Sequence, residues 1–172
     1  MDSYCARRGR RSLNRSAGHR IAAGAVGLLS AAVLSGCGIQ IPTDPGGTLE
    51  EVRGGTLRVG ISAEPELAEI TDAGPSGALV DLIDGFAEGI EADVDWQIAS
   101  EEHLVGLLEA DRLDVAIGGF TTDTPWVDRV GTTREVGSLT GSEGRPVVIL
   151  VEAGENAFLS ELERYIDAEA GS

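Results

Sequence analysis

Polar side chains follow a short apolar run in the middle of the chain, with a pair of glycines between them. Residues 115–117 are Val-Ala-Ile, residues 118–119 are both glycine, and residues 121–123 are Thr-Thr-Asp. Two glycines after a buried strand let the backbone approach another group closely, and the polar groups that follow can then contact a ligand. An ordinary connection in which Thr or Asp caps a helix is the alternative. The candidate ligand-binding residues in this loop are Thr121, Thr122 and Asp123.

Two further side chains are candidates for the same site. Glu64 follows the first expected strand, at the end where open α/β sheets bind ligands, so it either faces a cationic ligand or remains solvated. Trp126 offers three roles: a stacking platform, a contact for a partner protein, or packing over the core.

Catalytic and metal-binding motifs are missing from the sequence. Nothing resembles a nucleophile elbow, a zinc motif or the spacing of a calcium loop. His103 is expected on the surface, and no second histidine follows residue 37. We therefore expect no catalytic residue, no metal and no cofactor, and a protein that is not an enzyme.

The N-terminus predicts an export signal. Six arginines in residues 1–20 precede an apolar run at residues 21–34, which is too short to span a bilayer in the mature protein. Residues 34–37, Leu-Ser-Gly-Cys, resemble the lipobox of bacterial lipoproteins, whereas a plain secretory signal is the alternative. The resemblance implies a signal peptide at 1–36, a lipidated Cys37 and attachment to the outer face of the cytoplasmic membrane. Residues 37–55, rich in Gly, Pro and acids, are expected to form a flexible tether.

The charge of the chain limits its partners. After Cys37 there are seven arginines and twenty-eight acidic residues, and the chain has no lysine. Such a body is repelled by nucleic acid and by anionic lipid, and most of its acids are expected to be solvated. With Cys37 lipidated, no cysteine remains for a disulfide.

Periodicity predicts one α/β domain over residues 56–168. Apolar runs at 57–61, 94–98 and 115–117 alternate with two amphipathic helices, which gives a β-α-β-α-β order. Right-handed crossovers then place these strands in a parallel sheet between helices, a three-layer α/β/α fold. One more strand at 147–151 and a helix from about Asn156 complete the domain.

The order of these segments resembles the first lobe of the family 3 solute-binding proteins, the receptors of polar amino-acid ABC importers. The resemblance is carried by residues 56–61, 77–82 and 107–133, and by 146–166 as the segment that returns to this lobe. It implies one lobe of a type II periplasmic-binding-protein fold, with a short connector (137–145) in place of the second lobe. A ligand would be small, polar and weakly held, unless a membrane transporter component or a second copy in a homodimer supplies the other wall.

One loop departs from that family. Aligned without a gap, Thr121 takes the family's Ser/Thr position, and Trp126 stands where the family has an arginine that pairs with the ligand carboxylate. Arg129, three residues further on, is a candidate to reach back around a turn toward the site. The leading hypothesis is a membrane-anchored solute-binding lipoprotein for transport or sensing. The alternative is a degenerate module that docks on a transporter or another envelope protein.

Overall fold

The computed structural model describes residues 44–137 and 139–170, which belong to one compact unit, Ile41–Ser172. The expected signal peptide (1–36) and the expected lipid-bearing Cys37 lie outside the described residues. Within the described ranges, no helix has the length and apolar character needed to cross a bilayer.

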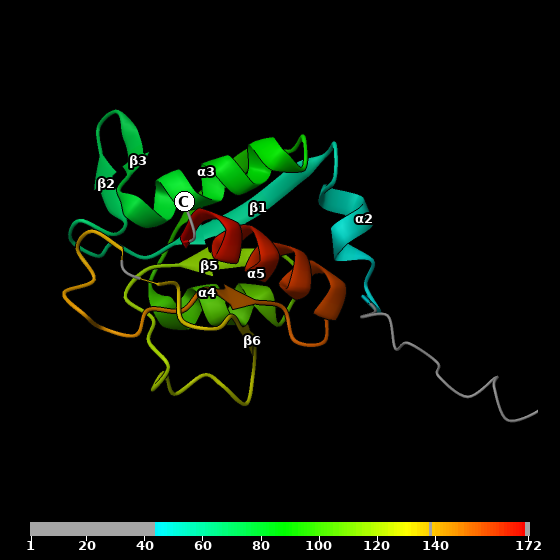
Figure 1. Cartoon of the computed structure of the whole chain (residues 1–172). Coiled ribbons are helices and arrows are strands. Elements are labelled where there is room, and N and C mark those ends of the chain that lie inside the picture. Colours follow the sequence, from blue (N-terminus) through cyan, green and yellow to red (C-terminus); the bar gives the residue numbers. More distant parts are fainter. Residues whose placement is uncertain (1–43, 138, 171–172) are drawn as a thin grey trace, which may run out of the picture. The chain divides into compact units, whose positions relative to one another are not determined.

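A five-stranded sheet forms the centre of this unit (Figure 1). Its strands are β1 Thr56–Ile61, β4 Asp93–Ile98, β5 Val115–Ile117, β6 Gly131–Thr132 and β7 Leu150–Val151, and the main helices are α3 Ala78–Gly89, α4 Glu101–Leu108 and α5 Asn156–Ala170. The order across the sheet is β4-β1-β5-β7-β6. β1 runs parallel to β4 and β5, because α3 and α4 carry the chain back between these strands. β7 is antiparallel to both β5 and β6.

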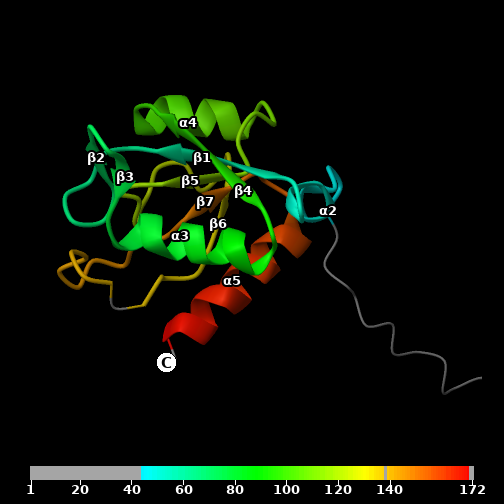
Figure 2. The same ribbon diagram turned by 90° about the horizontal axis from the view of Figure 1, so that it is seen from above.

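Helices cover both faces of the sheet. Figure 2 shows α4 on one face, with α3 and α5 on the other. Successive side chains of a strand point to opposite faces, so Leu57 and Val59 of β1 face α3 and α5, while Gly60 faces α4. A methyl group at Gly60 would lie 2.6 Å from atoms of Leu104 and Leu113, so this glycine lets α4 pack closely. The predicted three-layer α/β/α fold is confirmed.

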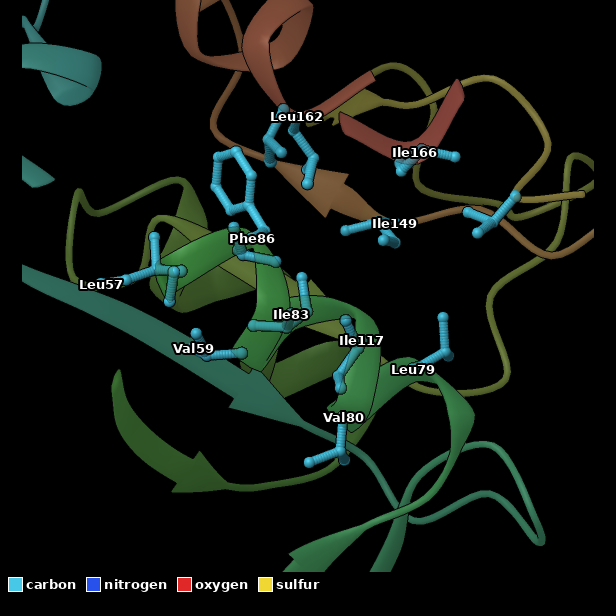
Figure 3. Packing of buried hydrophobic residues seen from close by; sticks show 14 of the residues in the cluster. Leu57, Val59, Leu79, Val80, Ile83, Phe86, Ile117, Ile149, Leu162 and Ile166 are labelled. Carbon is cyan, nitrogen blue, oxygen red and sulfur yellow. The ribbon is translucent and has the colours of Figure 1, made fainter. Parts of the chain in front are cut away.

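The larger core lies between the sheet and the pair α3 and α5. Leu79, Ile83 and Phe86 recur at helical spacing along α3 and are fully or almost fully buried (Figure 3). Phe86 meets Phe158 of α5 edge to face, with ring centroids 5.9 Å apart. Burying each such side chain stabilises the fold by about 1.5–3 kcal/mol.

The expected tether is folded from Asp44 onward. A short helix, α2 (Thr48–Val52), buries Thr48 and Val52. Asp44 accepts hydrogen bonds from backbone amides at the start of α5, and Glu155 accepts hydrogen bonds from amides at and before the start of α2. The prediction of a flexible segment over residues 37–55 is therefore wrong for residues 44–55, because Asp44 and Arg53 have partners on α5.

A hairpin lies between β1 and α3. It consists of β2 (Glu69–Thr71) and β3 (Gly74–Ser76). Ser76 pairs with Glu69 in the hairpin, and the N-cap residue of α3 is Gly77. Gly77 has φ +118°, and a methyl group there would lie 2.7 Å from the carbonyl oxygen of Leu67. The close approach of the two backbones requires glycine at this position.

Candidate functional site

The loops after β1, β4 and β5 meet at one edge of the sheet. Two backbone hydrogen bonds hold them together just beyond the strands: Ser62 N donates to Ile117 O (3.0 Å), and Ala99 N donates to Ile61 O (3.1 Å). We call this region the carboxyl edge and define it by residues 62–64, 99–101 and 118–121. Ligands of open α/β sheets bind at such an edge.

The two glycines after β5 allow close contacts, as the sequence predicts, and the contacts are with the chain itself. A methyl group at Gly118 would lie 2.9 Å from Ser62 O. One at Gly119 would lie 2.7 Å from Glu64 Oε2 and 3.6 Å from Glu101 Oε1. Two carboxylates from different segments therefore flank the same glycine: Glu64 from the loop after β1 and Glu101 from the first turn of α4.

Glu64 is held at this edge and is already paired. Its backbone exchanges two 2.8 Å hydrogen bonds with Ala68. Its Oε1 lies 2.7 Å from Nη2 of Arg145, and the Glu64 side chain keeps 24% of its surface exposed. An open hollow of about 490 Å³ lies beside Glu64 and is also lined by Ala68 and Glu69. A solute can therefore reach this carboxylate from solvent.

The charges at the carboxyl edge favour a cation. Glu64 and Glu101 contribute two carboxylates against the single guanidinium of Arg145, and Glu66 and Glu69 are exposed in the adjoining segment. A surface with an excess of one charge attracts small ions of the opposite charge. No group of three or more His, Cys, Asp or Glu side chains among the described residues is arranged to hold a metal ion.

The loop of Thr121, Thr122 and Asp123 begins at the carboxyl edge, and it does not cap a helix. Thr121 forms an isolated bridge with Val147, and Thr122 N donates to Pro146 O (3.0 Å). Thr121 is half-buried, whereas Thr122 and Asp123 are exposed. Residues 122–123 and 125–129 lie in turns and not in a helix, so the alternative of a helix cap is wrong. Of these three candidates, Thr121 lies within the edge shared with Glu64.

Trp126 packs against the smaller core, which lies on the α4 side of the sheet. The buried residues of this core include Leu104, Phe120 and Val130. The indole Nε1 is buried and has no hydrogen-bond partner among the described residues. Of the three roles considered for Trp126, the structure favours packing over the core.

The structure does not bring Arg129 to the carboxyl edge. Its guanidinium lies 5.2 Å from the centre of the Trp126 ring and pairs with Glu109, Nε donating to Oε1 at 2.8 Å. This ion pair lowers the pKa of the Glu109 carboxyl. Glu109 follows the last residue of α4, about 12 Å along the helix from Glu101, which begins it. Arg129 therefore lies toward the opposite end of α4.

The sequence-based list of candidates missed Glu101 and Arg145. Glu101 follows β4, which neighbours β1, so the argument that selected Glu64 applies to it as well. The segment after Arg145 leads into β7, which is antiparallel to β5. This segment therefore begins near the carboxyl end of β5, where the candidate site lies. The place of Arg145 in a Gly- and Ser-rich connector hid this signal.

Comparisons with known proteins identify the fold. No protein-family model matches the chain, and no curated protein matches it. Among solved structures, a mutant of the arginine-bound form of domain 1 of TmArgBP, from T. maritima, has a TM-score of 0.63 and 21% identity and covers 72% of this chain and 99% of that one. An arginine-specific periplasmic binding protein of Salmonella typhimurium has a TM-score of 0.59 and 11% identity, and the match covers 68% of this chain and 94% of that one.

An ancestral arginine-binding protein bound to arginine is similar in the same way, with a TM-score of 0.60, 13% identity, and coverage of 70% of this chain and 94% of that one. Identities this low show the fold alone. Residues 44–137 and 139–170 have the fold of a single lobe of a periplasmic binding protein.

Proposed function

We propose that the domain binds a small organic cation, such as a basic amino acid, at the carboxyl edge. The proposal depends on one arrangement: the carboxylates of Glu64 and Glu101 flank Gly119, and Glu64 already forms an ion pair with the guanidinium of Arg145. Guanidinium and ammonium groups form their strongest hydrogen bonds with carboxylates. Thr121 adds a polar group at the same edge.

The similar structures support this ligand class. All three are arginine-bound or arginine-specific by name, and one of them is a single domain with arginine. A ligand on one lobe keeps much of its surface in water, whereas ordinary pockets bury about 70–90% of it. The affinity of the isolated domain would therefore be low. A transporter component or a second copy of the chain would supply the missing wall.

The N-terminal sequence supports a location for solute binding outside the cytoplasm. With a signal peptide at 1–36 and lipid on Cys37, the domain would capture its solute at the outer face of the cytoplasmic membrane, for ABC-type transport or for sensing. Expression of the full chain with Cys37→Ser tests the anchor. In cells grown with labelled palmitate, the unchanged chain should carry the label and the variant should not. Absence of label on the unchanged chain would contradict lipidation.

Calorimetry on the chain from residue 37 onward, with Cys37→Ser to prevent lipidation, tests solute binding. L-Arginine and L-lysine should release or absorb heat, and L-glutamate should not. Glu64→Gln and Glu101→Gln should each weaken binding about tenfold, as expected for a hydrogen bond to a charged group. Glu102→Gln, at the next and exposed position of α4, is the matched control and should bind like the parent. If no cation binds, the proposal is wrong and the docking hypothesis takes its place.

A further inference from the structure

Arg145 contacts the carboxyl edge as a ligand cation would. Its Nη2 lies 2.7 Å from Glu64 Oε1, and its Nε donates to the carbonyl oxygen of Ser142 at 3.2 Å. The side chain of Arg145 is 38% exposed, so its guanidinium remains open to exchange with solvent and with other cations.

The connector that carries Arg145 is fastened on both sides of the edge. Ser142 is only 4% exposed, and its amide donates to Leu139 O (3.1 Å). Gly141 has φ +85°, and a methyl group there would lie 2.4 Å from Cβ of Glu66, so this turn lies against the segment after β1. On the other side, Pro146 O accepts the hydrogen bond of Thr122 N. The backbone around Arg145 therefore holds its side chain within reach of Glu64.

We infer that Arg145 is an internal occupant of the solute site, which a cationic ligand must displace from Glu64. This inference rests on the proposed function and adds a residue that sets its affinity and selectivity. The apparent affinity equals the intrinsic affinity multiplied by the fraction of molecules in which the Arg145–Glu64 pair is open. Ion pairs with this exposure shift such an equilibrium by up to about fivefold. Neutral solutes cannot replace the guanidinium on Glu64, so Arg145 selects for cations.

A different role for Arg145 makes the opposite prediction. If its guanidinium held the carboxylate of an amino-acid ligand, removing it would weaken the binding of L-arginine. Methylguanidinium has no carboxylate, so a carboxylate clamp would not affect it. Comparing these two probes distinguishes an occupant from a clamp.

The experiment is an NMR titration that follows the backbone amides of Glu64 and Gly119, with methylguanidinium and L-arginine as probes. Arg145→Ala and Arg145→Gln should bind both probes about fivefold more tightly than the parent chain. Arg164→Ala removes the same charge from an exposed pair on α5 and should bind like the parent. Adding Glu64→Gln to Arg145→Ala should remove this gain and leave binding about tenfold weaker than in the parent, as Glu64→Gln alone does, because no pair with Glu64 is left to open. Circular dichroism and the unfolding midpoint confirm that each variant is folded.

Three outcomes would overturn the inference: unchanged affinity for methylguanidinium without Arg145, weaker binding of L-arginine in both Arg145 variants, or no methylguanidinium shift at Glu64 and Gly119. The proposed function fails separately. If the Arg145 variants bind methylguanidinium at Glu64 more tightly than the parent does, but no amino acid binds to any variant, Arg145 is an internal occupant of a site with no free amino-acid ligand.

Discussion

Asp44 and Glu155, from opposite ends of the described chain, each cap the helix that follows the other residue. Asp44 Oδ1 accepts hydrogen bonds from the first-turn amides of α5, Ala157 N (2.6 Å) and Phe158 N (2.9 Å). Glu155 precedes α5 and accepts from Thr48 N, the first residue of α2, at 3.2 Å. Each carboxylate thereby satisfies amides that a helix leaves unpaired and lies favourably near a helix N-terminus.

Loss of this cap should destabilise the whole domain. Asp44→Ala leaves two amides of α5 without their acceptor and should lower the free energy of unfolding by about 1–2 kcal/mol. Urea denaturation followed by circular dichroism measures the change. Asp72→Ala, at an exposed turn position, is the control and should change stability little. Equal midpoints for the two variants would mean that residues near 44 do not stabilise the fold.

The two aspartates that share Arg58 should differ in importance. Asp114 is 2% exposed and accepts from both the amide and the guanidinium of Arg58, whereas the side chain of Asp111 is 68% exposed. Asp114→Asn removes a buried charge partner and should cost about 2 kcal/mol. Asp111→Asn should cost under about 1 kcal/mol. Chemical denaturation of both variants checks the order, and a larger cost for Asp111→Asn would contradict it.

A pair of glycines separates backbone strain from steric contact. Gly74 and Gly77 have φ +120° and +118°, but a methyl group would meet nothing within 4 Å at Gly74 and the Leu67 carbonyl at 2.7 Å at Gly77. Replacement by alanine should cost about 1–3 kcal/mol at either position from strain. Gly77→Ala should cost about 1–3 kcal/mol more. Thermal unfolding of the two variants measures the difference, and similar midpoints would exclude the contact.

Glu152 should make stability depend on pH. Burial, followed by the nearby carboxylates of Asp111 and Glu155, raises its pKa in the folded state. At pH values above its folded-state pKa, the charged Glu152 side chain therefore lowers the free energy of unfolding. The penalty is lost as pH falls through the folded-state and then the unfolded-state value. Glu152→Gln should stabilise the domain at pH 7 by roughly a few tenths of a kcal/mol, since solvent screens the group.

The check on Glu152 is a series of urea titrations between pH 7 and pH 3. The advantage of the glutamine variant should shrink toward zero at the acid end. A stabilisation that is constant across this range would show that side-chain packing, and not charge, is its cause.

The unpaired indole of Trp126 predicts a tolerant substitution. Trp126→Phe removes a buried N–H that has no partner in the described part of the chain, and this gain should offset the lost contacts to within about 0.5 kcal/mol. Trp126→Ala should cost about 3 kcal/mol, because it opens a cavity beside the smaller core. Denaturation curves distinguish the two. An equally large cost for the Phe variant would indicate that the N–H has an important role.

The sequence alone determined the order of the main elements. Apolar residues at helical spacing predict α3, α4 and α5, as with Leu79, Ile83 and Phe86, and the apolar runs at β1 and β5 predict buried strands. The handedness of crossover connections then determines which strands are parallel neighbours. These signals are local, so they can be read without knowing the fold. They also bring Glu64 and Thr121 to one edge of the sheet.

Only the tertiary structure decided which distant groups meet. Asp44 looked like part of a tether because its partners lie on α5, and Arg145 looked like part of a short connector because no periodicity marks its pairing with Glu64. Trp126 packs inward while Arg129 turns to Glu109, although both follow the same loop. Such pairings depend on hydrogen bonds and ion pairs between residues far apart in the chain. Their energies arise only once the sheet and its helices have placed those residues together.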